Sequence, residues 1–290
     1  MTRADDEPIP LTVLMRAFNE ADRIEAAIRS ALPLRAEILV IDSGSTDATA
    51  TIARSLGARV VTNPWAGFGP QRRFGEGECR HDHVFSMDAD EVLTPALVRE
   101  IRALFRPGPP PALAKVRKAM ALPHRDRPPP FAFCTEQIYL YDRRVARTID
   151  NPNWDHLEIR TDEAPRRLRA VAWHFTYRDW NHAVAKANYV AELAARTSAP
   201  RSRLSLTLRL LVEFPSTFLR FYILRRLFLA GADGFAMATI LAFGRFLRIA
   251  KMREAKMREA KMREAKMRER APSRAADPAG GATDAQGAAR

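Results

Sequence analysis

Short apolar runs alternate with segments of helical periodicity along the first third of the chain. The apolar runs, which predict buried strands, span residues 11–15, 37–41, 58–62 and 84–87. The helical segments span residues 21–32, 48–56 and 95–105. Because strands that alternate with helices favour parallel pairing, this pattern predicts an α/β fold with a mainly parallel sheet and helices on both faces. Ligands bind such sheets beyond the carboxyl ends of the strands.

The flanking segments differ in composition. Residues 107–111 and 128–130 are rich in proline and predict irregular loops. Residues 131–180 mix aromatic residues with short apolar runs, and we expect a few further strands there that complete one domain over residues 11–200. Residues 1–10 predict a polar tail without an apolar signal segment, so we expect no secretory signal.

The composition changes at residue 201, where leucine, phenylalanine and arginine become frequent. Residues 201–250 contain eight arginines, one glutamate and one aspartate. The longest uncharged stretch, 234–244, falls short of the roughly 20 residues that a membrane-spanning helix needs. We therefore expect a pair of basic amphipathic helices that lie on an anionic membrane surface.

Residues 251–270 repeat the sequence KMREA four times, with Arg270 in place of the last alanine. Strong helix formers and pairs such as Glu254 with Arg258 predict a helix. A period of five residues turns by about 140° per repeat, so no continuous apolar stripe forms and we expect a solvated extension. The final segment, 271–290, predicts a disordered tail.

The formal net charge of +13 favours anionic partners: nucleic acid, phosphorylated ligands or a membrane face. A nucleic-acid-binding protein would carry its basic residues on a recognised module, interleaved with aromatic residues. Here the excess charge lies in the apolar C-terminal region, so we expect no nucleic-acid partner. The two cysteines, Cys79 and Cys134, form no CxxC motif and indicate a reducing compartment.

Two carboxylates, Asp88 and Asp90, follow the apolar run 84–87 and precede a predicted helix. We expect these two carboxylates to point to different sides where the strand ends. One carboxylate could therefore face a ribose while the other binds Mg²⁺ or Mn²⁺, which prefer oxygen ligands. The alternative is a cluster at the helix N-terminus, in which Asp90 and Glu91 interact with the helix dipole.

Two further polar segments lie near predicted strand ends. Asp42 ends a strand before Ser43-Gly44-Ser45, where it could accept hydrogen bonds from a base or ribose; the alternative is a capped turn. Residues 67–73, with the sequence GFGPQRR, hold two arginines that suit a diphosphate; the alternative is a solvated basic loop. No P-loop motif is present.

In this order and spacing, these segments resemble the family-2 glycosyltransferases of the GT-A fold, and most of all the branch of lipopolysaccharide core glucosyltransferases. The resemblance covers residues 11–250 and rests on six segments. They are RAFNE at 16–20, IDSGSTDAT at 41–49, GFGPQRR at 67–73, MDADE at 87–91, QIYLY at 137–141 and HFTYRD at 174–179.

The resemblance implies a GT-A domain over residues 11–200 that holds a nucleotide-sugar donor. Asp42 would contact the base and Asp88 the ribose. Asp90 would bind Mg²⁺ or Mn²⁺, and His174 would be a further ligand, with a structural histidine as the alternative. The donor-binding residues implied in this way are Arg16, Phe18, Asn19, Glu20, Asp42, Ser43, Gln71, Arg72 and Asp88, of which Gln71 and Arg72 would lie near the phosphates.

The family inverts the anomeric configuration, which requires a carboxylate to deprotonate the acceptor hydroxyl. In the resembling branch that carboxylate follows a proline in a stretch like Val-His-Glu, whereas this chain reads NPNWDHLE at 151–158. Counting from Pro152 favours Asp155 as the base. Alignment on His156 places Leu157 at the expected carboxylate and leaves Glu158 or Asp155; a polar surface turn is the alternative for the segment.

The activity implied is transfer of a hexose, glucose from UDP-glucose, to a lipid-linked acceptor such as the lipopolysaccharide inner core. Alternatives are a polyprenyl-phosphate or exopolysaccharide acceptor, and a non-catalytic homologue. A nucleotidyltransferase would need a glycine-rich, basic segment near the first strand, which RAFNE does not supply. The basic C-terminal region would hold the enzyme peripherally on the inner, cytoplasmic face of the membrane.

Overall fold

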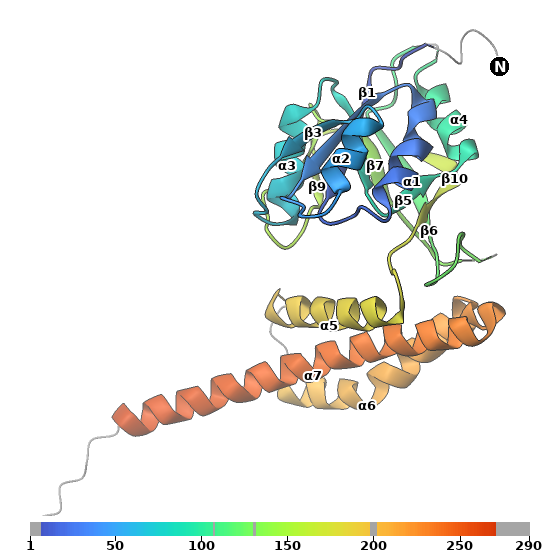
Figure 1. The fold of residues 1–290 in the computed structure, drawn as a ribbon. Coiled ribbons are helices and arrows are strands. Elements are labelled where there is room, and N and C mark those ends of the chain that lie inside the picture. The colour runs from blue at the N-terminus through green and yellow to red at the C-terminus, as the bar shows by residue number, and fades with distance from the viewer. Residues whose placement is uncertain (1–6, 107, 130–131, 198–201, 271–290) are drawn as a thin grey trace, which may run out of the picture.

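The computed structural model describes residues 7–270 except 107, 130–131 and 198–201, and its elements form two layers. The upper layer in Figure 1 is an α/β domain. The lower layer consists of helices α5 (Trp180–Thr197), α6 (Arg203–Leu219) and α7 (Gly231–Arg270). The predicted tail 271–290, and most of the tail 1–10, lie outside the described residues.

The α/β domain carries the strands. They are β1 (Leu11–Ala17), β2 (Glu37–Asp42), β3 (Arg59–Thr62), β4 (His83–Asp88), β5 (Glu91–Leu93), β6 (Leu113–Met120), β7 (Cys134–Asp142), β8 (Ala146–Thr148), β9 (Leu157–Ile159) and β10 (Arg166–His174). Its helices are α1 (Ile24–Ala31), the 3₁₀ turn η2 (Leu32–Leu34), α2 (Thr49–Ser55), α3 (Phe68–Glu78) and α4 (Pro95–Leu104).

An eight-stranded sheet runs in the order β3-β2-β1-β4-β7-β6-β10-β5, and β8 pairs with β9 in a small second sheet. The strands β3, β2, β1 and β4 are parallel, as the alternating pattern predicts. The antiparallel pairs flank β7, which lies between β4 and β6, and β5 pairs antiparallel with β10. The carboxyl ends of β1 and β4 therefore lie side by side, and the site is built there.

The segment GFGPQRR corrects one expectation, because it opens helix α3 rather than forming a loop. The helix packs closer to the sheet than a side chain would allow. A Cβ built on Gly75 would lie 2.6 Å from Leu14 Cδ1, and one on Gly69 would lie 2.4 Å from the carbonyl oxygen of Ile149. The glycines thus serve close packing, and they bring Arg72 of α3 against the strand ends.

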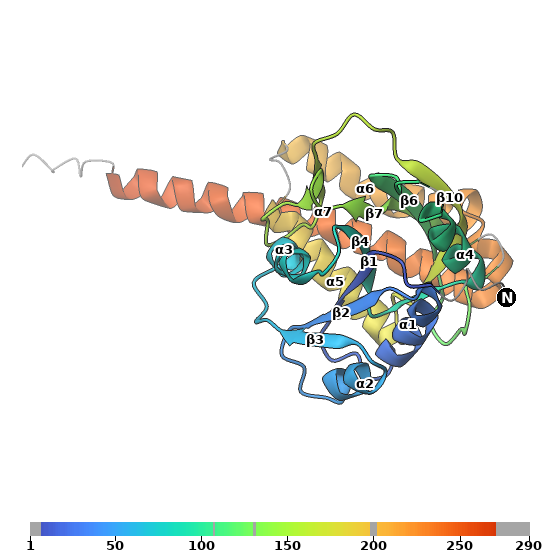
Figure 2. The ribbon, with the colours of Figure 1, turned by 90° about the horizontal axis from the view of Figure 1, so that it is seen from above.

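The helical layer begins at Trp180, whereas we expected the helical region to start at residue 201. Helix α5 packs along α7, and Gly244 of α7 meets Ala187 of α5, where an added Cβ would lie 3.2 Å away. The five-residue π-helix η3 (Arg220–Leu224) and the 3₁₀ turn η4 (Leu227–Ala230) join α6 to α7. Figure 2 shows the repeat segment as the projecting end of α7, continuous with the part that packs on α5.

The stretch Leu227–Met267 is long and apolar enough, by length and composition alone, to count as a candidate membrane span. Our count of uncharged residues over 234–244 excluded such a span, and it was too strict because a spanning window tolerates a charged residue such as Asp233. Within that apolar window, 28% is buried inside the protein.

Candidate active site

The Asp88 carboxylate lies at the carboxyl ends of β1 and β4, between the guanidinium groups of Arg16 and Arg72. Arg16 of β1 is the register partner of Asp88 of β4, and its Nη2 lies 2.7 Å from Asp88 Oδ1. Arg72 of α3 approaches the same oxygen at 3.5 Å. Burial would raise the pKa of Asp88, but the charges of Arg16 and Arg72 outweigh it and hold this pKa well below its usual range. Asp88 is therefore an ionised acceptor.

Asp155 completes this cluster, and Glu158 does not. Asp155 Oδ2 lies 3.0 Å from Arg16 Nη1 and 3.1 Å from Arg72 Nη2, so both arginines bridge Asp88 and Asp155. Glu158 lies on β9, where its half-exposed carboxylate accepts a 2.9 Å hydrogen bond from Arg160. Of the two expected base candidates, the fold brings Asp155 to the strand ends, because the loop between β8 and β9 packs on the start of α3.

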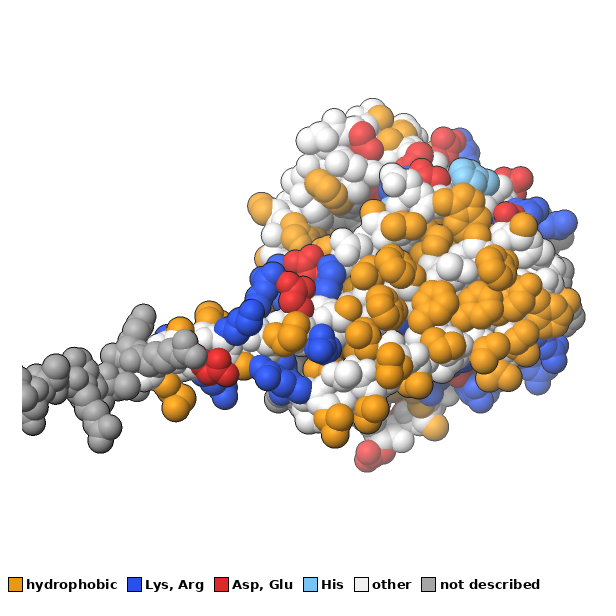
Figure 3. Space-filling model, turned by 90° about the horizontal axis from the view of Figure 1, so that it is seen from below, with side chains coloured by type: hydrophobic (Ala, Val, Ile, Leu, Met, Phe, Trp, Pro, Cys, Tyr) orange, Lys and Arg blue, Asp and Glu red, His pale blue; other side chains and the backbone are white. Residues whose placement is uncertain are grey.

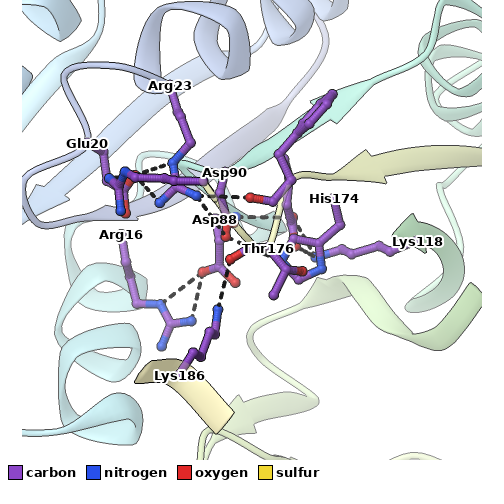
Figure 4. Close-up of polar contacts among 12 residues, drawn as sticks. Arg16, Glu20, Arg23, Asp88, Asp90, Lys118, His174, Thr176 and Lys186 are labelled. Carbon is purple, nitrogen blue, oxygen red and sulfur yellow. Dashed lines mark hydrogen bonds and ion pairs between the residues drawn. The ribbon is translucent and has the colours of Figure 1, made fainter. Parts of the chain in front are cut away.

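Asp90 points away from Asp88 and faces the end of β10 (Figure 4). In an extended chain, residues two positions apart would share a face, but β4 ends at Asp88 and the chain turns at Ala89 and Asp90 before β5. Asp90 Oδ2 lies 3.4 Å from His174 Nε2 and 3.8 Å from Arg23 Nη1. Burial would lower the pKa of His174, but the hydrogen bond and charge of Asp90 raise it. The same contact lowers the pKa of Asp90 against the effect of burial.

The donor set around Asp90 fits a divalent cation. Ligand atoms of Asp90, Glu91 and His174 lie within 4.8 Å of one another. Glu91 is already balanced, since both its oxygens contact Lys118, which leaves one carboxylate and one imidazole as the available ligands. Oxygen and imidazole donors suit Mn²⁺ or Mg²⁺ when phosphate oxygens and water complete the shell.

Lys118 of β6 is a site residue that the sequence did not reveal. Its ammonium lies 2.5 Å from both oxygens of Glu91 and 3.2 Å from the centre of the Tyr139 ring. Burial lowers the pKa of Lys118 and raises that of Glu91, and each partner's charge opposes the shift. Lys118 sits in a strand of mixed basic and apolar residues, so no local signal marks it as buried.

The RAFNE segment forms one wall of the site, where the carboxylate of Glu20 is bound by neighbouring arginines. Glu20 contacts Arg23 at 2.5 Å and Arg178 at 2.9 Å. Arg23 also donates to the backbone carbonyl of Phe175, next to His174. These contacts hold the loop after β1 against the HFTYRD segment. They explain why both segments belong to one site although Glu20 and Arg178 are 158 positions apart in sequence.

Asn19, Asp42 and Ser45 tie two neighbouring strand-end loops together. Asn19 adopts a left-handed φ of 54°, and its side-chain oxygen accepts a hydrogen bond from the amide of Thr46. Both oxygens of Asp42 are engaged by Ser45, and Asp42 is only 3% exposed. The capped-turn alternative therefore describes Asp42, which shapes the loop instead of projecting into open space.

Gln71 is a second correction, because it is fully buried and does not reach the open site. Its amide group donates to Ser43 Oγ and to the carbonyl of Asn63, while its oxygen accepts from the Asn63 side chain. Ser43 is likewise held in this network, whereas Phe18 is 56% exposed. Gln71 positions the loop after β2, and Arg72 is the α3 side chain that reaches Asp88.

A cavity of about 610 Å³ opens beside Asp90. Ala89, Asp90 and Phe175 lie on the side of the strand ends, and His124 and Arg125 lie on the loop after β6. Arg125 also bonds to Asp233 at the start of α7. The cavity therefore joins the carboxylate cluster to the helical layer.

A sequence model described as Glycosyl transferase family 2 matches residues 12–151. An uncharacterized glycosyltransferase of Rickettsia bellii is 35% identical over 257 residues, which cover 84% of this chain and 87% of the relative. The chain belongs to glycosyltransferase family 2. Membership confirms the predicted GT-A fold and shows that the protein is a glycosyltransferase.

Two other similar proteins have more specific descriptions. The lipopolysaccharide core biosynthesis glycosyltransferase LpsC of Rhizobium meliloti is 28% identical over 84% of this chain and 92% of its own length. Among solved structures, glucosyl-3-phosphoglycerate synthase from Mycobacterium tuberculosis, in complex with Mn²⁺, UDP and glucosyl-3-phosphoglycerate, is 28% identical with a TM-score of 0.32. That match covers 39% of this chain and 44% of the synthase.

Proposed function

We propose that this glycosyltransferase is an inverting, divalent-metal-dependent hexosyltransferase whose donor is a nucleoside diphosphate sugar, with UDP-glucose as the leading candidate. The observation that carries the proposal is the arrangement at the strand ends. The Asp90–His174 pair lies on one side of Asp88, and Arg16 and Arg72 lie on the other. A metal-ligand pair and two guanidinium groups together suit a diphosphate, which carries the charge that leaves in the reaction.

Asp90 and His174 would hold the cation. A divalent cation bound there supplies charge neutralisation for the departing nucleoside diphosphate. Arg16 and Arg72 would bind diphosphate oxygens, since guanidinium groups form paired hydrogen bonds with them. Buried Lys118 and Glu91 lie behind the site and keep Asp88 and Asp90 oriented through the hydrogen bond from the Asp88 amide to Glu91.

Asp155 is the proposed base, and its contacts suggest an order of events. Before the donor binds, Arg16 and Arg72 hold Asp155 Oδ2. Donor phosphates that engage the same arginines would weaken this hold and free the carboxylate. Asp155 then accepts the acceptor hydroxyl proton while the acceptor oxygen bonds to the anomeric carbon and the bond to the diphosphate breaks.

We further propose that the acceptor is a lipid-linked saccharide and that the enzyme lies on the inner face of the cytoplasmic membrane. The underside of the helical layer is an apolar face, seen in Figure 3 as a broad hydrophobic area with Lys and Arg side chains at its edge. The exposed large apolar side chains of this layer include Leu204, Leu208, Leu211, Val212, Leu219, Ile223, Leu224, Phe228, Leu229 and Phe235. An apolar centre with a basic edge complements an anionic bilayer surface. The lipopolysaccharide core function named for LpsC supports this acceptor class.

The deciding experiment is donor hydrolysis by the purified protein with a panel of UDP-, GDP-, ADP- and dTDP-sugars in Mn²⁺ or EDTA. We expect release of one nucleoside diphosphate that requires metal. Asp90→Ala should lower the rate by at least about 100-fold, because the charge that develops on the leaving group loses its stabilisation. Asp162→Ala, which removes an exposed carboxylate from a loop, is the matched control and should leave the rate unchanged.

Failure to release any nucleoside diphosphate would contradict the proposal and favour a non-catalytic homologue. Transfer to a polyprenyl phosphate, with no transfer to a lipid-linked core saccharide, would keep the reaction and replace the acceptor.

A further inference from the structure

A second, strongly basic cavity of about 800 Å³ lies apart from the strand-end site. Its lining combines sheet residues with the segment after η3, and it contains five arginines against one acidic residue, Glu136. The arginines are Arg117 of β6, Arg167 and Arg169 of β10, and Arg225 and Arg226 after η3. Such an excess of guanidinium groups around one hollow favours an anionic ligand.

The cavity is separate from the donor site because it opens on the other face of the sheet. Arg117 and Lys118 are consecutive in β6, so their side chains point to opposite faces. Lys118 is buried behind the metal-ligand pair, whereas Arg117 is exposed and pairs in register with Glu136 of β7. A ligand in this cavity therefore does not compete with the donor phosphates for Arg16 or Arg72.

The basic side chains in the cavity are held in place. Arg225 stacks over the Phe133 ring with its guanidinium carbon 4.0 Å from the ring centre. Phe133 in turn contacts Phe221 of η3, at 6.1 Å between ring centres. Arg167 forms hydrogen bonds of 2.8 and 3.0 Å to Glu136, which neutralises a single positive charge. The positive excess thus comes from both layers, and its donors are partly ordered before a ligand binds.

The cavity also adjoins the apolar face. Leu224 lines the cavity and is 76% exposed at the end of η3, and Arg225 follows it directly. Exposed Phe228 and Leu229 come a few residues later. A lipid whose chains lie against this face would therefore bring its headgroup to the level of the arginines.

We propose that this cavity binds the phosphate headgroup of an anionic membrane lipid and so fixes how the enzyme sits on the bilayer. Guanidinium groups bind phosphate oxygens in paired, directional hydrogen bonds, which a flat basic surface does not provide. This inference rests on the proposed membrane contact of the apolar face, and it adds a headgroup-specific site to it.

The test measures binding of the full-length protein to phosphatidylcholine vesicles with and without phosphatidic acid. The variant Arg117→Gln/Arg225→Gln removes two cavity charges, and Arg258→Gln/Arg263→Gln removes two from the projecting repeat. We expect the cavity variant to lose affinity for the acidic vesicles by roughly tenfold to thirtyfold. The control variant should lose less than about twofold, since its charges lie on the solvated helix far from the cavity. Unchanged donor hydrolysis would show that both variants fold.

Equal losses in the two variants would overturn the proposal in favour of diffuse charge attraction. If the cavity variant loses affinity for acidic vesicles while the wild-type protein still binds neutral vesicles, the membrane contact and the headgroup site are separate features, as proposed. Absence of binding to any vesicle would overturn both, and donor hydrolysis would remain a separate test of the catalytic assignment.

Cys134 provides a second readout, since it lines the cavity and is half-buried. Short-chain phosphatidic acid should slow alkylation of Cys134 in wild type and not in the cavity variant. Protection by inorganic phosphate at the same concentration would overturn the assignment to a lipid, because a free anion would then suffice.

Discussion

At the scale of single residues, the site is organised by shared partners. Arg16 and Arg72 each contact both Asp88 and Asp155, so a change of charge at one member alters the electrostatic environment of the other three. The buried pair Lys118–Glu91 shows the same dependence. Removal of one partner from such a pair leaves a buried, uncompensated charge, which is strongly destabilising.

Asp155→Asn should abolish most transfer activity, with a fall of about 10²–10⁴-fold in kcat, because the acceptor loses its base. The same change removes a negative competitor for Arg16 and Arg72, so nucleoside diphosphate should bind more tightly. Glu158→Gln is the control and should change neither quantity. Steady-state kinetics and calorimetric titration with UDP measure the two effects; full activity in Asp155→Asn would exclude it as the base.

Lys118→Met should lower the free energy of unfolding by about 3–5 kcal/mol, because Glu91 would stay buried without its partner. The double variant Lys118→Met/Glu91→Gln should recover a large part of that loss, since neither charge remains. Urea unfolding of the wild type, both single variants and the double variant measures the coupling. Strictly additive losses would show that the two side chains do not act as a pair.

Cys79 should resist alkylation at pH 8 while Cys134 reacts. Burial raises the pKa of Cys79 to about 12, and only the thiolate is nucleophilic. The Cys79 residue is also only 6% exposed. Mass spectrometry after treatment with iodoacetamide separates the two cysteines, and urea should make Cys79 reactive. Rapid labelling of Cys79 in the folded protein would contradict its placement under α3.

At the scale of elements, α3 shows how composition and packing combine. The glycines of GFGPQRR favoured a loop, but the segment opens a helix in which Gly69 and Gly75 allow close contacts. Gly75 faces Leu14 and Ile41 of the sheet, whereas a Cβ on Gly77 would meet nothing within 4 Å. Because both positions lie in the same helix, substitutions at them distinguish the effect of packing from that of helix propensity.

Gly75→Ala should therefore destabilise the protein by about 1–3 kcal/mol, as expected for overpacking in a core. Gly77→Ala should be neutral or stabilise by up to about 1 kcal/mol, because alanine has the higher helix propensity. Thermal unfolding of the two variants gives the comparison. Equal effects at both positions would mean that α3 does not pack against Leu14 as described.

At the scale of the whole molecule, the α/β domain stands on a helical layer with an apolar underside (Figures 1 and 3). The two layers are joined where Arg125 meets Asp233 and where Lys186 of α5 donates to the carbonyl of Thr176, next to the metal-ligand pair (Figure 4). The orientation of the helical layer on a membrane would therefore determine the direction in which the 610 Å³ cavity opens.

Leu208→Glu/Leu211→Glu should abolish binding to vesicles, because it replaces two exposed apolar side chains of α6 with charges. Met262→Glu, on the exposed part of the repeat helix, is the control and should bind as wild type does. Vesicle sedimentation measures both. Extraction of the wild type from membranes by high salt or carbonate would support a peripheral position, and retention under both conditions would favour a spanning α7.

The sequence by itself determined the strand and helix pattern, the parallel half of the sheet and the family. Hydrophobic periodicity is local, so β1 to β4 and α1 could be predicted. The different directions of Asp88 and Asp90 come from the turn between β4 and β5, which only the structure shows. Only the tertiary structure showed that Asp155, and not Glu158, lies beside Arg16 and Arg72 and that Gln71 is buried. It also brought Lys118 to Glu91 and His174 to Asp90. These contacts join residues 27 to 139 positions apart through sheet order and loop packing, which no local pattern records.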